Sequence, residues 1–149
     1  MIRIVFAVAA IAAGLTIAVA QDPVAARRAV MKEFGKNHYG AVLPVSQGRQ
    51  PFDQAKIDAA FAGLEETVKR LPGAFPAGSD KGPDAGSDYY LKQGALDNRA
   101  DIDAKIANMQ KAIADNKVKA KDADSTKAAY TAVNDTCNSC HTTYRLKKS

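Results

Sequence analysis

The chain has 149 residues, with 46% hydrophobic and 25% charged residues and a formal net charge of +5 at pH 7. This length suits a single domain behind a short leader. The positive charge is mild and its lysines are scattered, which excludes the basic stripe expected of a nucleic-acid-binding protein.

The first 20 residues are predicted to form a secretory signal peptide. Arg3 supplies a positive start, residues 4–19 are apolar, and Ala18-Val19-Ala20 resembles a cleavage site. The alternative is an uncleaved membrane anchor, but the apolar run of about 16 residues is shorter than the roughly 20 needed to span a bilayer. We predict cleavage after Ala20, export to the periplasm, no stable membrane insertion, and one mature domain over residues 21–149.

Two amphipathic helices are predicted in the first half of the mature chain. The first covers about residues 23–42, and Pro44 together with the glycine and proline cluster of residues 48–51 is expected to end it. The second begins with Asp53 as its N-cap, because this residue precedes apolar positions at helical spacing. Pro72-Gly73 is expected to stop the second helix.

Residues 72–86 are rich in proline and glycine and predict a long irregular crossover without a strand. A third helix is predicted over about residues 87–116. A fourth is predicted to begin near Asp124-Ser125, which can cap it, and to continue to Tyr144. No segment alternates convincingly with a period of two, so we expect no sheet. The predicted fold class is all-α, an antiparallel four-helix bundle.

The fourth predicted helix carries Cys137-Asn138-Ser139-Cys140-His141. Cys-x-x-Cys-His is the attachment signal of c-type haem, in which two thiols form thioethers with the vinyl groups and the imidazole ligates iron. Spacings of three and four residues place Cys137, Cys140 and His141 on one helix face, which is also the apolar face. We therefore predict one covalently attached haem c inside the bundle core, where its absence would leave a large void.

Two other interpretations of the cysteine pair have less support. A thioredoxin-like redox pair sits beside a βαβ pattern, which this chain lacks. A structural zinc site needs four ligands, and the chain contains only two Cys and two His, so His38 would have to join from another helix. The sequence shows no acid–base pair, nucleophile–base constellation or phosphate loop, and we predict no enzyme activity.

The chain resembles the class II cytochromes c, the cytochrome c′ family. The resemblance rests on the haem motif with the following Thr-Thr-Tyr-Arg, on residues 27–37, and on Gly-Arg-Gln-Pro-Phe-Asp at residues 48–53. Leu71-Pro72 and Phe75-Pro76 are also similar. Class I cytochromes c instead place the motif near the N-terminus and take a methionine from far downstream. This chain cannot supply one, because only eight residues follow His141.

The resemblance leaves two functions open, which differ in the sixth ligand of the iron. In the cytochrome c-556 branch this ligand is a methionine of the first helix, four residues after an arginine. Met31 follows Arg27 by four residues, which predicts low-spin His/Met-ligated haem that carries single electrons by outer-sphere transfer. The alternative is a five-coordinate cytochrome c′, in which Met31 only covers the iron and small gases such as nitric oxide or carbon monoxide bind.

The first helix contains two rival ligands. His38 lies seven residues after Met31, roughly 10 Å along the helix axis, and is expected to face the bundle end or solvent. Lys32 takes the distal place if the helix is aligned backward from His38, but a lysine at the core seam is costly. Met109, in the middle of the third helix, is expected in the core.

Two arginines are candidate haem contacts. The resemblance places Arg145, one turn beyond His141, beside the haem, and Arg27 is the expected propionate partner with Arg28 as the alternative. The basic tail of residues 145–148 is either a docking patch for an acidic redox partner or a solvated helix end that suits the helix dipole. Periplasmic redox proteins are the expected partners, and the resemblance leaves a homodimer through the first two helices open.

Overall fold

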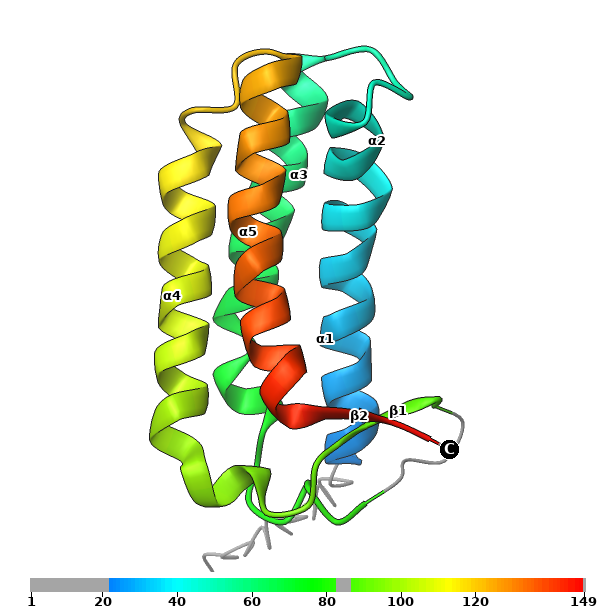
Figure 1. Ribbon diagram of the computed structural model, residues 1–149, viewed down its shortest axis with the longest axis vertical. Helices are drawn as coiled ribbons and strands as arrows, with labels where there is room; N and C mark the ends of the chain where they lie inside the picture. Colours follow the sequence, from blue (N-terminus) through cyan, green and yellow to red (C-terminus); the bar gives the residue numbers. More distant parts are fainter. Residues whose placement is uncertain (1–21, 83–86, 149) are drawn as a thin grey trace, which may run out of the picture.

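The computed structural model describes residues 22–82 and 87–148, so the predicted signal peptide lies outside the described residues. Within these residues, four long helices run side by side in alternating directions (Figure 1): α1 (Pro23–Asn37), α3 (Gln54–Lys69), α4 (Arg99–Lys117) and α5 (Ala123–Tyr144). The prediction of an antiparallel four-helix bundle is confirmed. No helix in this part of the chain is both long enough and apolar enough to cross a bilayer.

The first helix passes through Pro44 instead of ending before it. Its backbone widens into a π-helical turn, η1 (His38–Val42), and α2 (Leu43–Ser46) then continues in the same direction (Figure 1). Pro44 has no N–H for the carbonyl four residues earlier, and its ring crowds that carbonyl. The widened turn accommodates the proline, because the Leu43 N–H donates to the His38 carbonyl, five residues back.

The next helix begins where the sequence predicted. Asp53 is its N-cap, and the Asp53 carboxylate accepts a hydrogen bond from the backbone N–H of Lys56 at 3.2 Å. One face of α3 is buried against the rest of the bundle, through Ile57, Ala60, Phe61, Leu64, Thr67 and Val68. The short 3-10 turn η2 (Pro72–Ala74) follows the helix.

The last helix begins at Ala123, slightly before the predicted start. Its N-cap is Asp122, whose carboxylate accepts from the Ser125 backbone N–H at 2.7 Å, while the Ser125 hydroxyl accepts from the Asp122 N–H at 3.0 Å. This reciprocal capping box satisfies two N–H groups that a helix start leaves without intrahelical partners. Asp124 and Ser125, the predicted caps, therefore lie inside the first turn.

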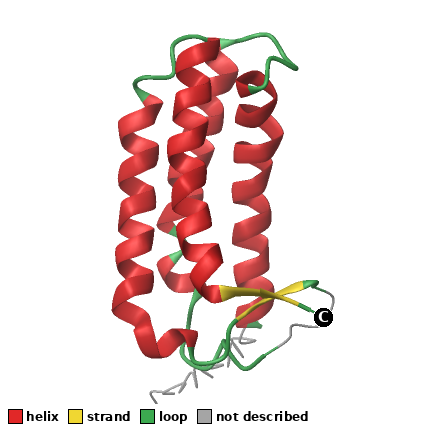
Figure 2. Ribbon diagram, viewed as in Figure 1, coloured by secondary structure: helices red, strands yellow, loops and turns green. Residues whose placement is uncertain are grey.

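A small antiparallel sheet contradicts the prediction that no strand forms. β1 (Tyr89–Leu91) pairs with β2 (Arg145–Lys147) below the helices (Figure 2), with Tyr89 opposite Lys147 and Leu91 opposite Arg145. The third helix was predicted from residue 87, but α4 begins only at Arg99, after the 3-10 turn η3 (Ala95–Asn98). The reason is local: Gly94 has a left-handed φ of 75°, which a helix cannot contain, and Tyr-Tyr-Leu favours extended backbone.

The basic tail of residues 145–148 joins the same sheet through β2 and does not continue the last helix. Arg145 has extended backbone angles, φ −101° and ψ 128°, and begins β2 directly after α5. The interpretation of residues 145–148 as a solvated helix end was therefore wrong. These residues are held by pairing with β1 and by a hydrogen bond from the Lys148 N–H to the Asp88 carbonyl at 2.8 Å.

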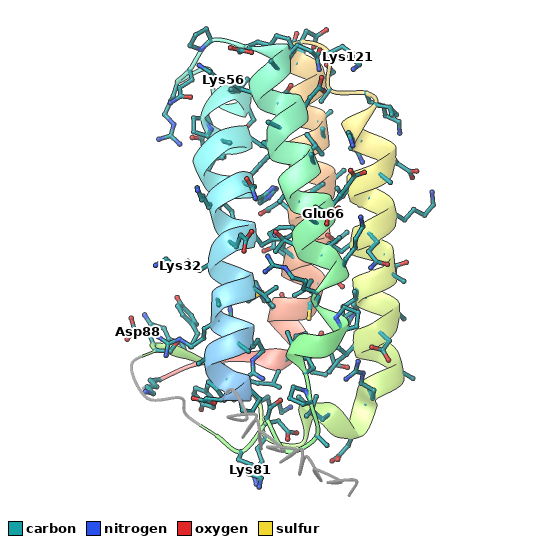
Figure 3. All side chains as sticks on the ribbon, turned by 180° about the vertical axis from the view of Figure 1, so that it is seen from behind. Lys32, Lys56, Glu66, Lys81, Asp88 and Lys121 are labelled. Carbon is teal, nitrogen blue, oxygen red and sulfur yellow. The ribbon has the colours of Figure 1, made fainter. Side chains whose placement is uncertain are left out.

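The two ends of the bundle are filled differently. At the end marked by Lys56 and Lys121 in Figure 3, apolar side chains close the core with almost no exposure. These are Val42, Ile57, Phe61, Ile113, Ala129 and Val133. At the end marked by Asp88, the helices enclose a cavity instead. Met109 is buried, as predicted, and lines that cavity.

Candidate functional site

A cavity of about 620 Å³ lies between α1, α4 and α5, and Leu71, Phe75 and β1 contribute to its wall. Its volume is in the range of small-molecule sites, roughly 300–1,000 Å³. The six residues that the sequence analysis assigned to the haem and its iron all line this one cavity, although they come from opposite ends of the chain: Arg27, Met31, Cys137, Cys140, His141 and Arg145.

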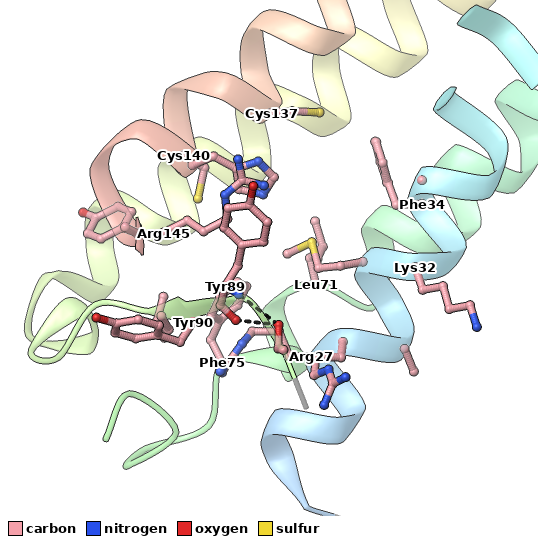
Figure 4. Close-up of a pocket in the computed structure, with 18 of the residues that line it drawn as sticks. Arg27, Lys32, Phe34, Leu71, Phe75, Tyr89, Tyr90, Cys137, Cys140 and Arg145 are labelled. Atoms are coloured by element: carbon pink, nitrogen blue, oxygen red, sulfur yellow. Dashed lines mark hydrogen bonds between the residues drawn. The ribbon is translucent and has the colours of Figure 1, made fainter. Parts of the chain in front are cut away.

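The two cysteines face the cavity from α5 (Figure 4). The Cys137 side chain is buried, that of Cys140 is half-buried, and the two sulfur atoms are not joined in a disulfide. Burial raises the pKa of the Cys137 thiol to about 11 and also raises that of Cys140. Cys137 is therefore present as a neutral thiol at neutral pH, a form that suits an apolar cavity wall.

His141 lies beside the cysteines and is half-buried. Burial lowers the pKa of its imidazole to about 4, and the positive charge of Arg145 acts in the same direction. The ring is therefore neutral at pH 7 and keeps a nitrogen lone pair, which an imidazole needs to ligate a metal.

The opposite wall comes from α1. Met31 is half-buried and packs against the hydrophobic core. Lys32 also lines the cavity but is exposed, and its ammonium end points away from the two cysteines (Figure 4). A soft thioether on an apolar wall is a suitable iron ligand, whereas a solvated ammonium carries no lone pair. The arrangement favours Met31 over Lys32 as the distal residue.

Arg27, the expected propionate partner, is buried and engaged with the crossover. Its guanidinium donates to the Ser79 hydroxyl and to the Ser79 carbonyl, both at 3.1 Å, and lies 5.7 Å from the centre of the Phe75 ring. Ser79, in the predicted irregular crossover, thus holds the Arg27 guanidinium at the cavity wall. Arg28, the alternative partner, is exposed and lines the cavity as well.

His38 is placed differently from its expectation. It is fully buried, and its ring stacks on Tyr130 with a centroid distance of 4.5 Å and meets the edge of Tyr39 at 4.9 Å. Burial lowers the pKa of His38 to about 4, and the nearby Asn134 side chain, which lies outside hydrogen-bond geometry to either ring nitrogen, acts in the opposite direction. The expectation that His38 faces the bundle end or solvent was wrong, because the seven-residue spacing from Met31 keeps it on the core-facing side of the helix, against Tyr130. His38 is absent from the described cavity wall.

Several cavity residues were not predicted. Tyr89, Tyr90 and Leu91 line the cavity because β1 runs along it, and the only sequence signal was an aromatic pair directly after the glycine-rich crossover. Tyr144 also contributes, and its hydroxyl donates to the Asp101 carboxylate, which raises the pKa of Tyr144 to about 12.

The charged side chains that line the described cavity wall are all of positive sign. The described lining residues include five cationic side chains and no carboxylate: Arg27, Arg28, Lys32, Lys105 and Arg145. Such a wall suits a ligand that is mostly apolar but carries anionic groups. Haem c has this chemistry, since its macrocycle is apolar and its two propionates are negative. Two thiols and a neutral imidazole on the facing helix complete the donor set.

A four-helix bundle with Cys-x-x-Cys-His beside an internal apolar cavity is the architecture of a class of haem proteins. The chain belongs to the cytochrome c′ family, whose model matches residues 22–145. It is a monohaem cytochrome that binds covalently attached haem c, and membership of this family favours an electron carrier or ligand binder over an enzyme.

The relatives include both branches of this family. The chain is 37% identical to cytochrome c-555 of Bradyrhizobium diazoefficiens over 99% of each chain, and 34% identical to cytochrome c-556 of Rhodopseudomonas palustris over 86% of this chain and 85% of the relative. Among solved structures, cytochrome c′ of R. palustris superposes with a TM-score of 0.75 at 30% identity, covering 86% of this chain and 98% of that one.

Proposed function

We propose that this protein is a periplasmic carrier of single electrons, with haem held by Cys137 and Cys140 and ligated by His141 and Met31. The observation that carries the proposal is that Met31 and His141 line the same cavity from different helices, α1 and α5. Bound haem supplies a one-electron redox couple at its iron. The protein supplies the anchors, the two axial donors and the surrounding low-polarity wall.

The side chains at this site suit electron transfer. The neutral His141 imidazole and the Met31 thioether would hold the iron of bound haem, and this pair of donors would favour a raised reduction potential. The wall also contains Phe34, Leu71 and Ile106, which exclude water and disfavour the more highly charged oxidised state. A saturated iron inside a packed bundle changes charge with little change in geometry.

The alternative is a five-coordinate cytochrome c′ that binds nitric oxide or carbon monoxide. The similarity to cytochrome c′ of R. palustris favours it, as does the incomplete burial of Met31. In that case the Met31 side chain covers the iron without ligating it, and a small gas displaces or passes this side chain. The cavity accommodates both the six-coordinate and the five-coordinate haem, because the two differ only in whether Met31 of α1 ligates the iron.

The optical spectrum of the haem-loaded protein, oxidised and reduced, with and without carbon monoxide, separates the two functions. A His/Met iron gives sharp split bands on reduction and no response to carbon monoxide. The variant Met31→Ala should then bind carbon monoxide, whereas the matched control Lys32→Ala should keep the wild-type spectrum. Broad high-spin bands that shift with carbon monoxide in the unmodified protein would move the function to gas binding.

The exposed basic residues of β2, Arg145 and Lys147, support a redox partner with an acidic surface. Lys147 is exposed on β2, next to the cavity end, while Lys121 is exposed at the far end of the bundle (Figure 3). Opposite charges raise association rates at low ionic strength. With hexacyanoferrate(III) as an anionic oxidant, Lys147→Glu should slow oxidation severalfold at low salt, and Lys121→Glu should not. Equal effects of both substitutions would exclude the β2 end of the bundle as the docking surface for the redox partner.

A further inference from the structure

Arg145 stands at the point where α5 stops being a helix. It follows His141 by one turn, but its backbone is extended, so its side chain leaves from the start of β2 rather than along the helix. Arg145 is exposed and lines the cavity. A long arginine side chain in this position has many rotamers, and its charge acts on the cavity only if something holds it there.

Tyr89 is the residue that contacts the Arg145 guanidinium. The guanidinium carbon lies 4.6 Å from the centre of the Tyr89 ring, a cation–π arrangement. In the sheet register, Arg145 pairs with Leu91 and Tyr89 pairs with Lys147, so Tyr89 and Arg145 are diagonal neighbours. This diagonal distance is within reach of an aromatic ring and a long cation.

The backbone that carries the half-exposed Tyr89 ring is fixed on both sides. The Ser87 hydroxyl donates to the Tyr89 carbonyl at 2.7 Å and accepts from the Tyr89 N–H at 3.2 Å, as the dashed lines in Figure 4 show. Beyond β1, the Lys92 N–H donates to the Tyr144 carbonyl at 2.8 Å and ties the strand to the end of α5. β1 therefore presents the Tyr89 ring from an anchored backbone, and the ring face limits the motion of the Arg145 cation.

We propose that Tyr89 is a positioning residue, which holds the Arg145 cation against the His141 side of the cavity and thereby raises the reduction potential of the haem. This inference rests on the proposed function. The physical reason is that reduction removes one positive charge from the iron. A fixed cation nearby stabilises the reduced state relative to the oxidised state, whereas a cation that swings into water is screened.

The test is a double-mutant cycle on the haem-loaded protein, read as the reduction potential. Tyr89→Ala should lower the equilibrium constant for reduction about threefold, or about 30 mV for a one-electron couple. Tyr89→Phe keeps the ring face and should leave the potential unchanged. In an Arg145→Gln background, Tyr89→Ala should have no further effect, because its action depends on the arginine.

Leu146→Ala is the matched control, since Leu146 lies in the same sheet but is exposed, does not line the described cavity and does not stack on Arg145. Its potential should stay at the wild-type value. Three results would overturn the inference: an additive double mutant, an equal loss in Leu146→Ala, or a loss in Tyr89→Phe as large as that in Tyr89→Ala.

A second readout does not depend on electron transfer. In the reduced protein, the Arg145 side-chain protons should show an upfield ring-current shift in NMR spectra that Tyr89→Phe keeps and Tyr89→Ala removes. If the iron proves five-coordinate, the spectrum is recorded with carbon monoxide bound. The optical spectrum reports whether Met31 ligates the iron, and it does not depend on the Tyr89 contact. The ring-current shift reports whether Tyr89 contacts Arg145, and it does not depend on the Met31 ligand. The absence of the shift in the unmodified protein would contradict the contact.

Discussion

The two halves of the bundle are built from the same four helices but close in different ways. In the half that contains Ile57, Phe61, Ile113 and Val133, side chains from neighbouring helices meet and leave these residues almost without exposure. In the half that contains the haem motif, the helices surround a cavity of about 620 Å³. Helix length and amphipathicity do not distinguish the halves, since each helix runs through both.

The difference shows where the fold depends on its prosthetic group. Close packing gives the filled half its own stability, because protein interiors reach the density of organic crystals only when side chains interlock. The other half lacks side chains to meet across the centre, so the haem completes its core. The structure therefore consists of a self-sufficient half and a half whose stability is coupled to a cofactor.

The largest expected effect follows from removing the anchors. In Cys137→Ser/Cys140→Ser, covalent haem should disappear entirely from a denaturing gel stained for haem. Hydrogen exchange should then show lost protection of amides in residues 27–35 of α1, while residues 57–64 of α3 stay protected. Asn138→Ala, between the cysteines and exposed, is the control and should keep its haem. Uniform loss of protection in both segments would mean that the two halves are one cooperative unit.

A matched pair of isoleucines on α4 sharpens the comparison. Ile113 lies in the filled half and Ile106, one heptad earlier on the same face, lines the cavity. In haem-free protein, Ile113→Ala should lower the free energy of unfolding by about 3–4 kcal/mol, and Ile106→Ala by roughly 1–2 kcal/mol, because Ile106 already borders empty space. Urea denaturation measures both. Equal losses would indicate that the cavity collapses without haem.

An expected effect similar in size to that of Ile106→Ala is a pH dependence from His38 in the filled half. Burial holds the folded-state pKa at about 4, below the value of about 6.5 in the unfolded chain. The unfolded state therefore binds more protons, and stability decreases as pH falls from 7 toward 4. Between pH 7 and pH 5 this amounts to about 2 kcal/mol.

His38→Phe preserves the ring stacking on Tyr130 and removes the titrating group. Urea unfolding of the haem-loaded proteins at pH 7 and pH 5 isolates the His38 contribution, because the release of His141 from iron is common to both. The variant should lose less stability between these pH values than the unmodified protein. Identical pH dependence in the two proteins would show that His38 takes up its proton as readily in the folded state as in the unfolded state.

Much of the fold was predictable from local patterns. Helical spacing of apolar residues located α3, and Asp53 marked its first turn, because capping depends on residues next to one another in the chain. The haem motif was equally local, since three and four residues suffice to bring its side chains to one helix face. Pro44 was misjudged because its consequence depended on a π-helical turn that its neighbours could accommodate.

The strands were not predictable from local patterns. β1 and β2 each have three residues and are stable only against one another, although more than 50 residues separate them in the chain. Nothing near Tyr89 reveals that Arg145 will lie over its ring. The sheet therefore escaped the search for alternation, and a helix was predicted in its place.

The sequence by itself determined the helices and the attachment motif, because both depend on spacing along one helix. The resemblance to the cytochrome c′ family added Met31, Arg27 and Arg145 as candidate haem contacts. Only the tertiary structure decided that Arg27 is held by Ser79, that His38 is buried among aromatic rings, and that the basic tail forms a strand. These outcomes depend on which distant segments meet. Such meetings are decided by the packing of the whole bundle, which no short stretch of sequence encodes.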